Sequence, residues 1–182
     1  MTQALIEQAR TFEAQTIQLV ATEMGEPLYK KVGFRNIGEY AFMKEGETTE
    51  PTTRCTSYHP KYREEILALD FAASGEDRQT LLEPHLSQAL VYCGDRLSGF
   101  YMPTLGEGLI IADNEEAGIS LMKNKLARAW LYIAIPRGNP PALEFLKSLG
   151  HKEYRVGKRM ALGPEIPWHP KMIFGRIGGN LG

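Results

Sequence analysis

The sequence contains little cysteine and no long apolar run. Two cysteines, Cys55 and Cys93, stand far apart, and neither belongs to a CxxC motif or a Cys/His ligand spacing. This pattern argues against a disulfide framework and a metal site, and it favours two buried thiols in a reducing compartment. No stretch approaches the ~20 apolar residues of a membrane span, and Glu7 and Glu13 stand where a signal peptide would be basic. We expect a cytoplasmic protein with no membrane partner.

The sequence also lacks an excess of either charge. Lysine and arginine number 21 against 22 aspartates and glutamates, which gives a formal net charge of −1. Nucleic-acid binding usually needs a broad electropositive field, so we expect no nucleic-acid partner. Hydrophobic residues make up 43% of the chain and charged residues 24%, which is typical of a globular protein that buries one good core or two small ones.

What the sequence does contain is a strand–helix–strand phrase that occurs twice. The two copies share a glycine at the end of the helix, and these glycines, Gly33 and Gly150, lie 117 residues apart. Each copy predicts an apolar strand, a short helix closed by the glycine, and a second extended run. The predicted segments are 17–21, 25–32 and 35–44 in the first copy, and a strand over 129–135 followed by a helix before Gly150 in the second.

Four regions are predicted along the chain. Apolar spacing predicts a helix over 4–14 ahead of the first copy, and a polar, turn-rich linker over 47–53 separates region 1–46 from region 54–163. Prolines and glycines predict an irregular tail over 164–182. Within the second region, ahead of the second copy, we predict strands over 54–58, 89–93, 97–102 and 108–112 and helices over 61–73, 77–87 and 115–127.

The run Leu-Tyr-Lys-Lys-Val-Gly-Phe at 28–34 resembles the GNAT superfamily of acyl-CoA-dependent N-acyltransferases. The longer run 21–34 is similar to the end of the first domain in two-domain members, whose second domain is a divergent GNAT. Phrases at 69–70, 75–78, 110–112 and 158–163 resemble that second domain. Together they cover most of residues 1–163. The resemblance implies a mixed α/β (α+β) fold, in which a twisted, mostly antiparallel sheet flanked by helices follows a partial GNAT domain.

By this resemblance, residues 1–46 hold only the C-terminal half of a first GNAT-like domain. GNAT domains contain elements that would precede the helix at 4–14, so a truncated product of a longer tandem protein is one alternative. Three strands and a helix are near the lower limit for an independent sheet, and the exposed edge of strand 17–21 invites pairing. We expect this half to pack on the second domain or on a partner chain, with a homodimer or other self-association completing it.

The resemblance also implies acetyl-CoA as cosubstrate. In GNAT folds the pantetheine arm binds like an added strand beside a splayed strand, which is 108–112 here, so Ile110, Ile111 and Ala112 would offer backbone groups. The pyrophosphate binds at the start of the next helix, which places Asn114 at the cofactor. Three carboxylates at 113, 115 and 116 stand in this loop in place of the usual glycine-rich phrase, and an ordinary acidic helix start is the alternative.

Two positions of the second copy carry the remaining family assignments. Asn139 either contacts the pantetheine or the acceptor, or it is the N-cap of the following helix. Seven residues after this position the family commonly has a tyrosine that protonates the thiolate. The count gives Leu146, which cannot donate a proton, whereas the same count from Thr22 in the first copy gives Tyr29. Tyr29 is therefore a catalytic acid only if another chain completes its site; otherwise it is an ordinary helix residue.

Acyl transfer to an amine also requires a base, and several residues lie near the presumed cleft. We select Glu107 and Tyr101 as catalytic candidates, and Tyr92 and His85 are further possibilities. Asp70 and Arg78 form an ion pair at a helical corner or line the acceptor cleft. The leading hypothesis is an acetyl-CoA-dependent N-acetyltransferase that acts on a primary amine of a small molecule or peptide. A catalytically inactive GNAT-like binding or assembly module is the alternative, and Leu146 with the acidic loop favours it.

Overall fold

A computed structural model describes residues 2–128 and 132–178. The α-helices are α1 (Thr2–Thr11), α2 (Glu26–Lys31), α3 (Arg63–Ser74), α4 (Gln79–Leu82), α5 (Glu115–Leu126) and α6 (Pro140–Ser148), and the 3-10 helices are η1 (Pro60–Tyr62), η2 (Glu83–Gln88) and η3 (Pro170–Met172). The strands are β1 (Ile17–Ala21), β2 (Arg35–Lys44), β3 (Cys55–Ser57), β4 (Leu90–Cys93), β5 (Leu97–Met102), β6 (Leu109–Ala112), β7 (Tyr132–Pro136), β8 (Lys152–Leu162) and β9 (Ile173–Gly175).

A four-stranded antiparallel sheet joins the two copies of the repeated phrase. Its order is β1-β8-β2-β7, so the first strand of each copy pairs with the second strand of the other copy. The two long strands, β2 and β8, pair at the centre of the sheet. Because β1 and β2 are not neighbours, residues 1–46 do not build a sheet by themselves. The expectation that this half packs on the second domain is confirmed, by insertion of β8 rather than by surface contact.

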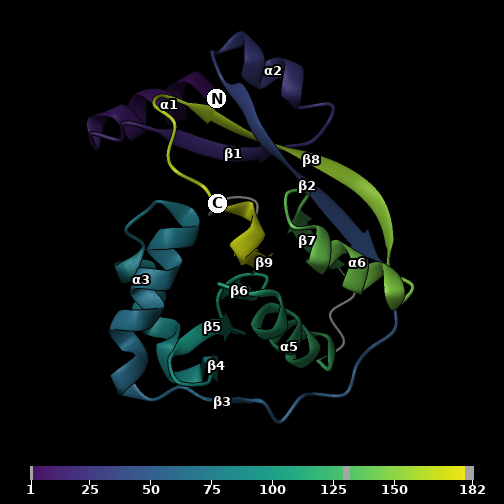
Figure 1. Cartoon of the computed structure of the whole chain (residues 1–182). Coiled ribbons are helices and arrows are strands. Elements are labelled where there is room, and N and C mark those ends of the chain that lie inside the picture. The colour runs from purple at the N-terminus through teal and green to yellow at the C-terminus, as the bar shows by residue number, and fades with distance from the viewer. Residues whose placement is uncertain (1, 129–131, 179–182) are drawn as a thin grey trace.

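A five-stranded antiparallel sheet, of order β3-β4-β5-β6-β9, lies at the other end of the molecule with α3 and α5 against it (Figure 1). Alternate residues of a strand point to opposite faces, and both faces of this sheet are buried. Phe100 and Ile111 belong to a core cluster with residues of α3, whereas Tyr101 and Ile110 belong to a cluster with residues of α5 and α6. The second cluster also contains residues of β2 and β7, so it connects the two sheets.

The tail joins both sheets. Trp168 packs over Gly38 of β2, where a Cβ atom would lie 2.8 Å from the indole ring, so only glycine leaves room for it. Further on, β9 pairs with the outer edge of β6. The prediction of an irregular tail over 164–182 is therefore wrong for 170–175, because apolar Ile173 and Phe174 pair and pack inside the fold.

Most predicted elements occur within a few residues of their expected bounds. The helix predicted over 77–87 divides into α4 and η2, because Pro84 has no N–H to continue an α-helical ladder. The first three residues of the predicted strand 129–135 lie outside the described residues. Cys55 and Cys93 are unpaired and half-buried rather than buried. Within the described ranges, no helix combines the length and the apolar character that a membrane span requires.

Candidate functional site

The strand that the resemblance assigns to the cofactor, β6, is paired along both edges. One edge pairs with β5, and the other pairs with β9, where Ile110 faces Gly175 and Ile111 faces Ile173. Two of the three backbone positions expected to receive the pantetheine arm, Ile110 and Ile111, thus face the chain's own tail. β9 also packs against β7, so it lies between β6 and β7, along the strand beside which the resemblance puts the cofactor.

Asn139 combines the helix cap with a contact to this tail. Its Oδ1 accepts a hydrogen bond from the N–H of Ala142 at 3.2 Å, which caps α6. Its Nδ2 donates to the carbonyl oxygens of Ile173 at 2.9 Å and Lys171 at 3.2 Å. The side chain is 1% exposed. The N-cap interpretation is confirmed. The Nδ2 group of the same side chain binds the backbone of the tail.

Asn114 begins α5 in the predicted pyrophosphate loop. Its Oδ1 accepts from the N–H of Ala117 at 2.9 Å, and its Nδ2 donates to Asp113 at 2.8 Å, so it is an N-cap. Asp113 pairs with Arg96, and Glu116 pairs with Arg54. Two of the three carboxylates in this loop thus have cationic partners, and negative charge at this end is favourable for the helix dipole. These observations support the ordinary acidic helix start.

The residues beside β6 do not fit acetyl-CoA in the conformation described. β9 pairs with the edge of β6 that the cofactor would need. The ring of Phe174 lies on Gly118, where an added Cβ atom would come within 2.3 Å of the ring. Carboxylates surround the helix start that would receive the pyrophosphate. Leu146 is fully buried in the core, with 0% exposure, and supplies no proton. The second copy therefore lacks both the open strand edge and the proton donor that acetyl transfer at β6 would need.

The two predicted catalytic residues lie close to the start of β6: Glu107 is partly exposed just before this strand, and Tyr101 is on the neighbouring strand β5. Glu107 binds Arg176 of the tail through two hydrogen bonds of 2.7 and 2.9 Å, so its carboxylate is engaged as an ion pair. Tyr101 is fully buried in the core beside Gly108. Nearby, the Lys125 ammonium donates to the carbonyl of Gly108 at 3.0 Å, and burial lowers its pKa to about 8. The sequence pattern gave no signal for Lys125 or Arg176.

The remaining candidate bases are His85 and Tyr92. His85 is on the surface, where its Nδ1 is 2.8 Å from the Thr104 hydroxyl. Tyr92 is half-buried against the core. Burial raises the pKa of the Cys55 thiol to about 11, so this thiol is not an activated nucleophile. Across the described ranges there is no group of three or more metal-ligating side chains.

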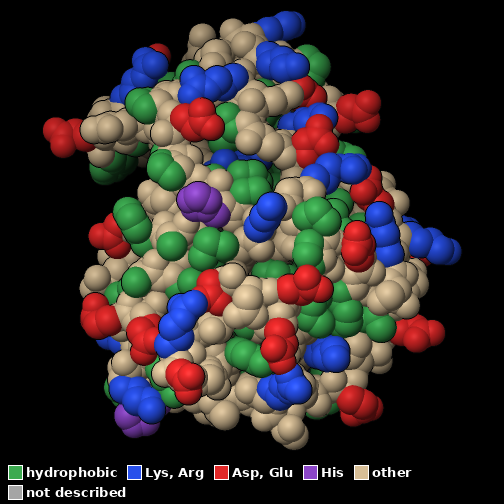
Figure 2. Space-filling model, in the orientation of Figure 1, with side chains coloured by type: hydrophobic (Ala, Val, Ile, Leu, Met, Phe, Trp, Pro, Cys, Tyr) green, Lys and Arg blue, Asp and Glu red, His purple; other side chains and the backbone are tan. Residues whose placement is uncertain are grey.

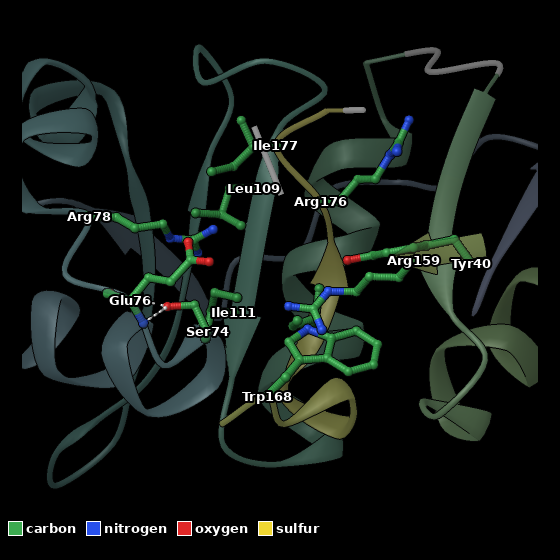
Figure 3. A pocket seen from close by; sticks show the side chains of 11 residues that line it. Tyr40, Ser74, Glu76, Arg78, Leu109, Ile111, Arg159, Trp168, Arg176 and Ile177 are labelled. Carbon is green, nitrogen blue, oxygen red and sulfur yellow. Dashed lines mark hydrogen bonds between the residues drawn. The ribbon is translucent and has the colours of Figure 1, made fainter. Parts of the chain in front are cut away.

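A small cleft lies between the α3–α4 corner and the four-stranded sheet (Figure 3). Arg78 and Glu76 face it from the corner, and Tyr40, Arg159 and Trp168 face it from the opposite side. Its volume is about 20 Å³, which holds roughly one water molecule. In this conformation the cleft is too small for an amine acceptor.

Ion pairs and ring contacts fix the walls of this cleft. Arg78 binds Asp70 through two hydrogen bonds of 2.6 and 3.0 Å, and Asp70 is 1% exposed. The predicted ion pair at the helical corner is confirmed, and Arg78 also lines the cleft. Arg159 lies 4.3 Å from the Trp168 ring and donates to Gln18, and burial lowers its pKa. Sequence reasoning missed Arg159 and Trp168, because they meet only when β8 and the tail fold together.

The first copy places Tyr29 on α2, directly after β1. Its ring is half-buried and packs edge to face on Phe34, with 5.7 Å between ring centroids. Thr22 begins the turn between β1 and α2, and its hydroxyl accepts from the N–H of Gly25 at 3.2 Å. In the described part of the chain, β1 pairs only with β8, so its other edge carries no strand.

The family model for the acetyltransferase (GNAT) domain matches residues 66–175. The chain belongs to the GNAT acetyltransferase family. Its match runs from α3 to the end of β9, so the tail strand is part of the matched domain. The GNAT-like fold predicted from the sequence is confirmed. No curated protein matches the sequence.

Solved structures share this fold. A proposed acetyltransferase from Pyrococcus horikoshii is 24% identical, with a TM-score of 0.83 over 100% of this chain and 64% of its own. A Drosophila protein is 14% identical, with a TM-score of 0.61 over 82% of this chain and 61% of its own. A proposed GNAT acetyltransferase from Novosphingobium aromaticivorans is 16% identical, with a TM-score of 0.55 over 84% and 75%. The chain thus spans 64% of the length of the Pyrococcus protein.

Proposed function

We propose that the chain acts in an acetyl-CoA-dependent N-acetyltransferase whose acceptor is the primary amine of a small molecule or peptide, and that catalysis belongs to the first copy of the phrase. The observation that carries this proposal is the contrast between the outer edges of β1 and β7. The outer side of β7 is filled by β9, and buried Leu146 follows it. Among the described strands none pairs with the outer edge of β1, and Tyr29 follows it on the next helix.

The reaction assigns one role to this chain. Acetyl-CoA supplies a thioester: the amine nitrogen bonds to its carbonyl carbon, the carbon–sulfur bond breaks, and the thiolate accepts a proton while the amine loses one. Tyr29 is the proton donor to the sulfur in this proposal. Its ring is held by Phe34 and its helix by a turn that Thr22 caps. The strand that would bind the pantetheine arm beside β1 comes from another segment or chain, and self-association through this edge stays a prediction.

The test is replacement of Tyr29 by phenylalanine in the full-length protein. Phenylalanine keeps the ring contact with Phe34 and removes only the hydroxyl. We expect kcat for thiol release from acetyl-CoA, measured with a panel of primary amines, to fall roughly a hundredfold or more, since general acid catalysis contributes about that much. Tyr132→Phe removes the hydroxyl of an exposed tyrosine at the start of β7 and should leave kcat unchanged. Equal rates for Tyr29→Phe and wild type, or no transfer by the wild type to any amine, would contradict the proposal.

A second candidate function applies to residues 54–175, which we infer to be a non-catalytic assembly module. The insertion of β8 between β1 and β2 favours it, because the first copy has no sheet without this strand. The two functions are compatible, since one region would hold the other in shape. We also propose a cytoplasmic location, which the two unpaired cysteines support.

A further inference from the structure

The tail strand β9 is anchored in both core clusters of the molecule. Ile173 and Phe174 are adjacent residues that point to opposite faces of the five-stranded sheet. Ile173 packs in the cluster with α3, and Phe174 packs in the cluster with α5. Ile177 follows in the α3 cluster at 1% exposure. Displacing this segment would therefore open two cores at once.

Polar contacts hold the same segment at both ends. At its start, the Asn139 amide donates to the carbonyls of Lys171 and Ile173. At its end, Arg176 is 5% exposed and forms a two-bond ion pair with Glu107, and the N–H of Glu107 donates to the carbonyl of Ile177. Charged bidentate pairs of this kind are among the stronger hydrogen bonds in proteins. Three of these contacts, two from the Asn139 amide and one from the Glu107 N–H, bind backbone carbonyls of the segment, as a site for an extended peptide does.

We infer that tail residues 171–177 permanently occupy the position between β6 and β7, along the strand to which the resemblance assigns the acyl-CoA arm, and that Asn139 is the positioning residue that holds them there. This inference concerns the second copy only. It stands or falls independently of catalysis by Tyr29.

The two asparagine caps allow a matched test. Asn139→Ser and Asn114→Ser both keep a good helix N-cap, but only the first removes an amide that reaches the tail. The measurement is backbone amide exchange of the tail peptide covering 171–178, followed by mass spectrometry. We expect Asn139→Ser to speed exchange of this peptide at least tenfold and Asn114→Ser to leave it unchanged. Unchanged exchange in Asn139→Ser, or equal acceleration in both variants, would overturn the positioning role.

Acetyl-CoA provides the second arm of the experiment. Exchange of the tail peptide and of the β6 peptide is measured in the wild-type protein with and without millimolar acetyl-CoA. We expect no change in either peptide, because the tail keeps its place. Faster exchange in the tail on addition of acetyl-CoA would show that the coenzyme displaces β9, and the inference of a resident occupant would be wrong. Neither readout depends on acyl transfer, so failure of the proposed catalytic function is a separate result.

Discussion

Gly118 is the position at which a single methyl group tests how the tail is seated. It lies inside α5, where alanine is normally better than glycine by about 1 kcal/mol. Here a Cβ atom would lie 2.3 to 2.4 Å from three carbon atoms of the Phe174 ring. Real Cβ contacts of this length do not occur, so the ring must move. The same substitution is thus expected to destabilise this protein.

The magnitude follows from where the ring can go. Phe174 is 2% exposed, and the core cluster shared by the two sheets surrounds it. A partial shift costs about 1–3 kcal/mol, as overpacked cores do. Expulsion of the ring costs about 3–5 kcal/mol, as loss of a buried phenylalanine does. After the gain in helix propensity of about 1 kcal/mol, we expect Gly118→Ala to lower the free energy of unfolding by about 0–2 kcal/mol if the ring shifts and by about 2–4 kcal/mol if it is expelled.

The assay is urea unfolding followed by far-ultraviolet circular dichroism. Gly94→Ala is the control, because no atom lies within 4 Å of its added Cβ, and it should change stability by less than about 0.5 kcal/mol. In the double variant Gly118→Ala/Phe174→Leu the smaller side chain relieves the overlap. The loss of unfolding free energy in the double variant should therefore be smaller than the sum of the losses in the two single variants. A gain of about 1 kcal/mol in Gly118→Ala would refute the seating of Phe174 on α5.

Three further predictions concern buried charge. Asp70→Ala leaves the Arg78 guanidinium buried without its partner, and chemical unfolding should show a loss of about 3–5 kcal/mol; a loss below about 1 would contradict a buried pair. Burial against Gly46 lowers the pKa of His151 from 6.5, so the unfolded chain binds its proton more tightly and stability falls as pH drops below that value. Phenylalanine occupies the equivalent position, Phe34, in the first copy. His151→Phe should therefore weaken the dependence of the melting temperature on pH between about pH 7.5 and 5, and an unaltered slope would contradict burial of a neutral ring. The pKa of Lys125 is lowered from 10.5 to about 8, so stability should rise with pH across that window, and Lys125→Met should remove the rise in melting temperature.

Much of the local structure could be predicted because its causes are local. Gly33 and Gly150 end their helices with positive φ angles of 95° and 79°, and Asn139 caps α6 as the Asn-Pro-Pro sequence indicates. The hairpin predicted around the turn at 94–95 gave the bounds of β5, 97–102, without error. The ion pair of Asp70 and Arg78 could also be predicted, since eight residues separate them across one corner.

The balance of charge in the sequence also has a visible counterpart. Acidic and basic side chains are interspersed over the face of the molecule that Figure 2 shows. Composition alone, however, does not reveal that Arg159 and Arg176 turn inward. Both are 5% exposed, although arginine is among the residues least often buried. Their partners, Gln18 and Glu107, lie 141 and 69 residues away along the chain, and no local pattern connects them.

The sequence by itself indicated the family, through its resemblance to GNAT proteins. It also determined most of the order of the elements and the doubling of one strand–helix–strand phrase, because these follow from residue periodicity and from caps formed within a few residues. Only the tertiary structure decided how the two copies share one sheet, with β8 lying between β1 and β2. It also decided that β9, from a tail rich in proline, pairs with the outer edge of β6. Strand pairing depends on strand edges that are far apart along the chain. The hydrophobic pattern of a strand indicates which of its faces is buried, but it does not indicate which strand pairs with it.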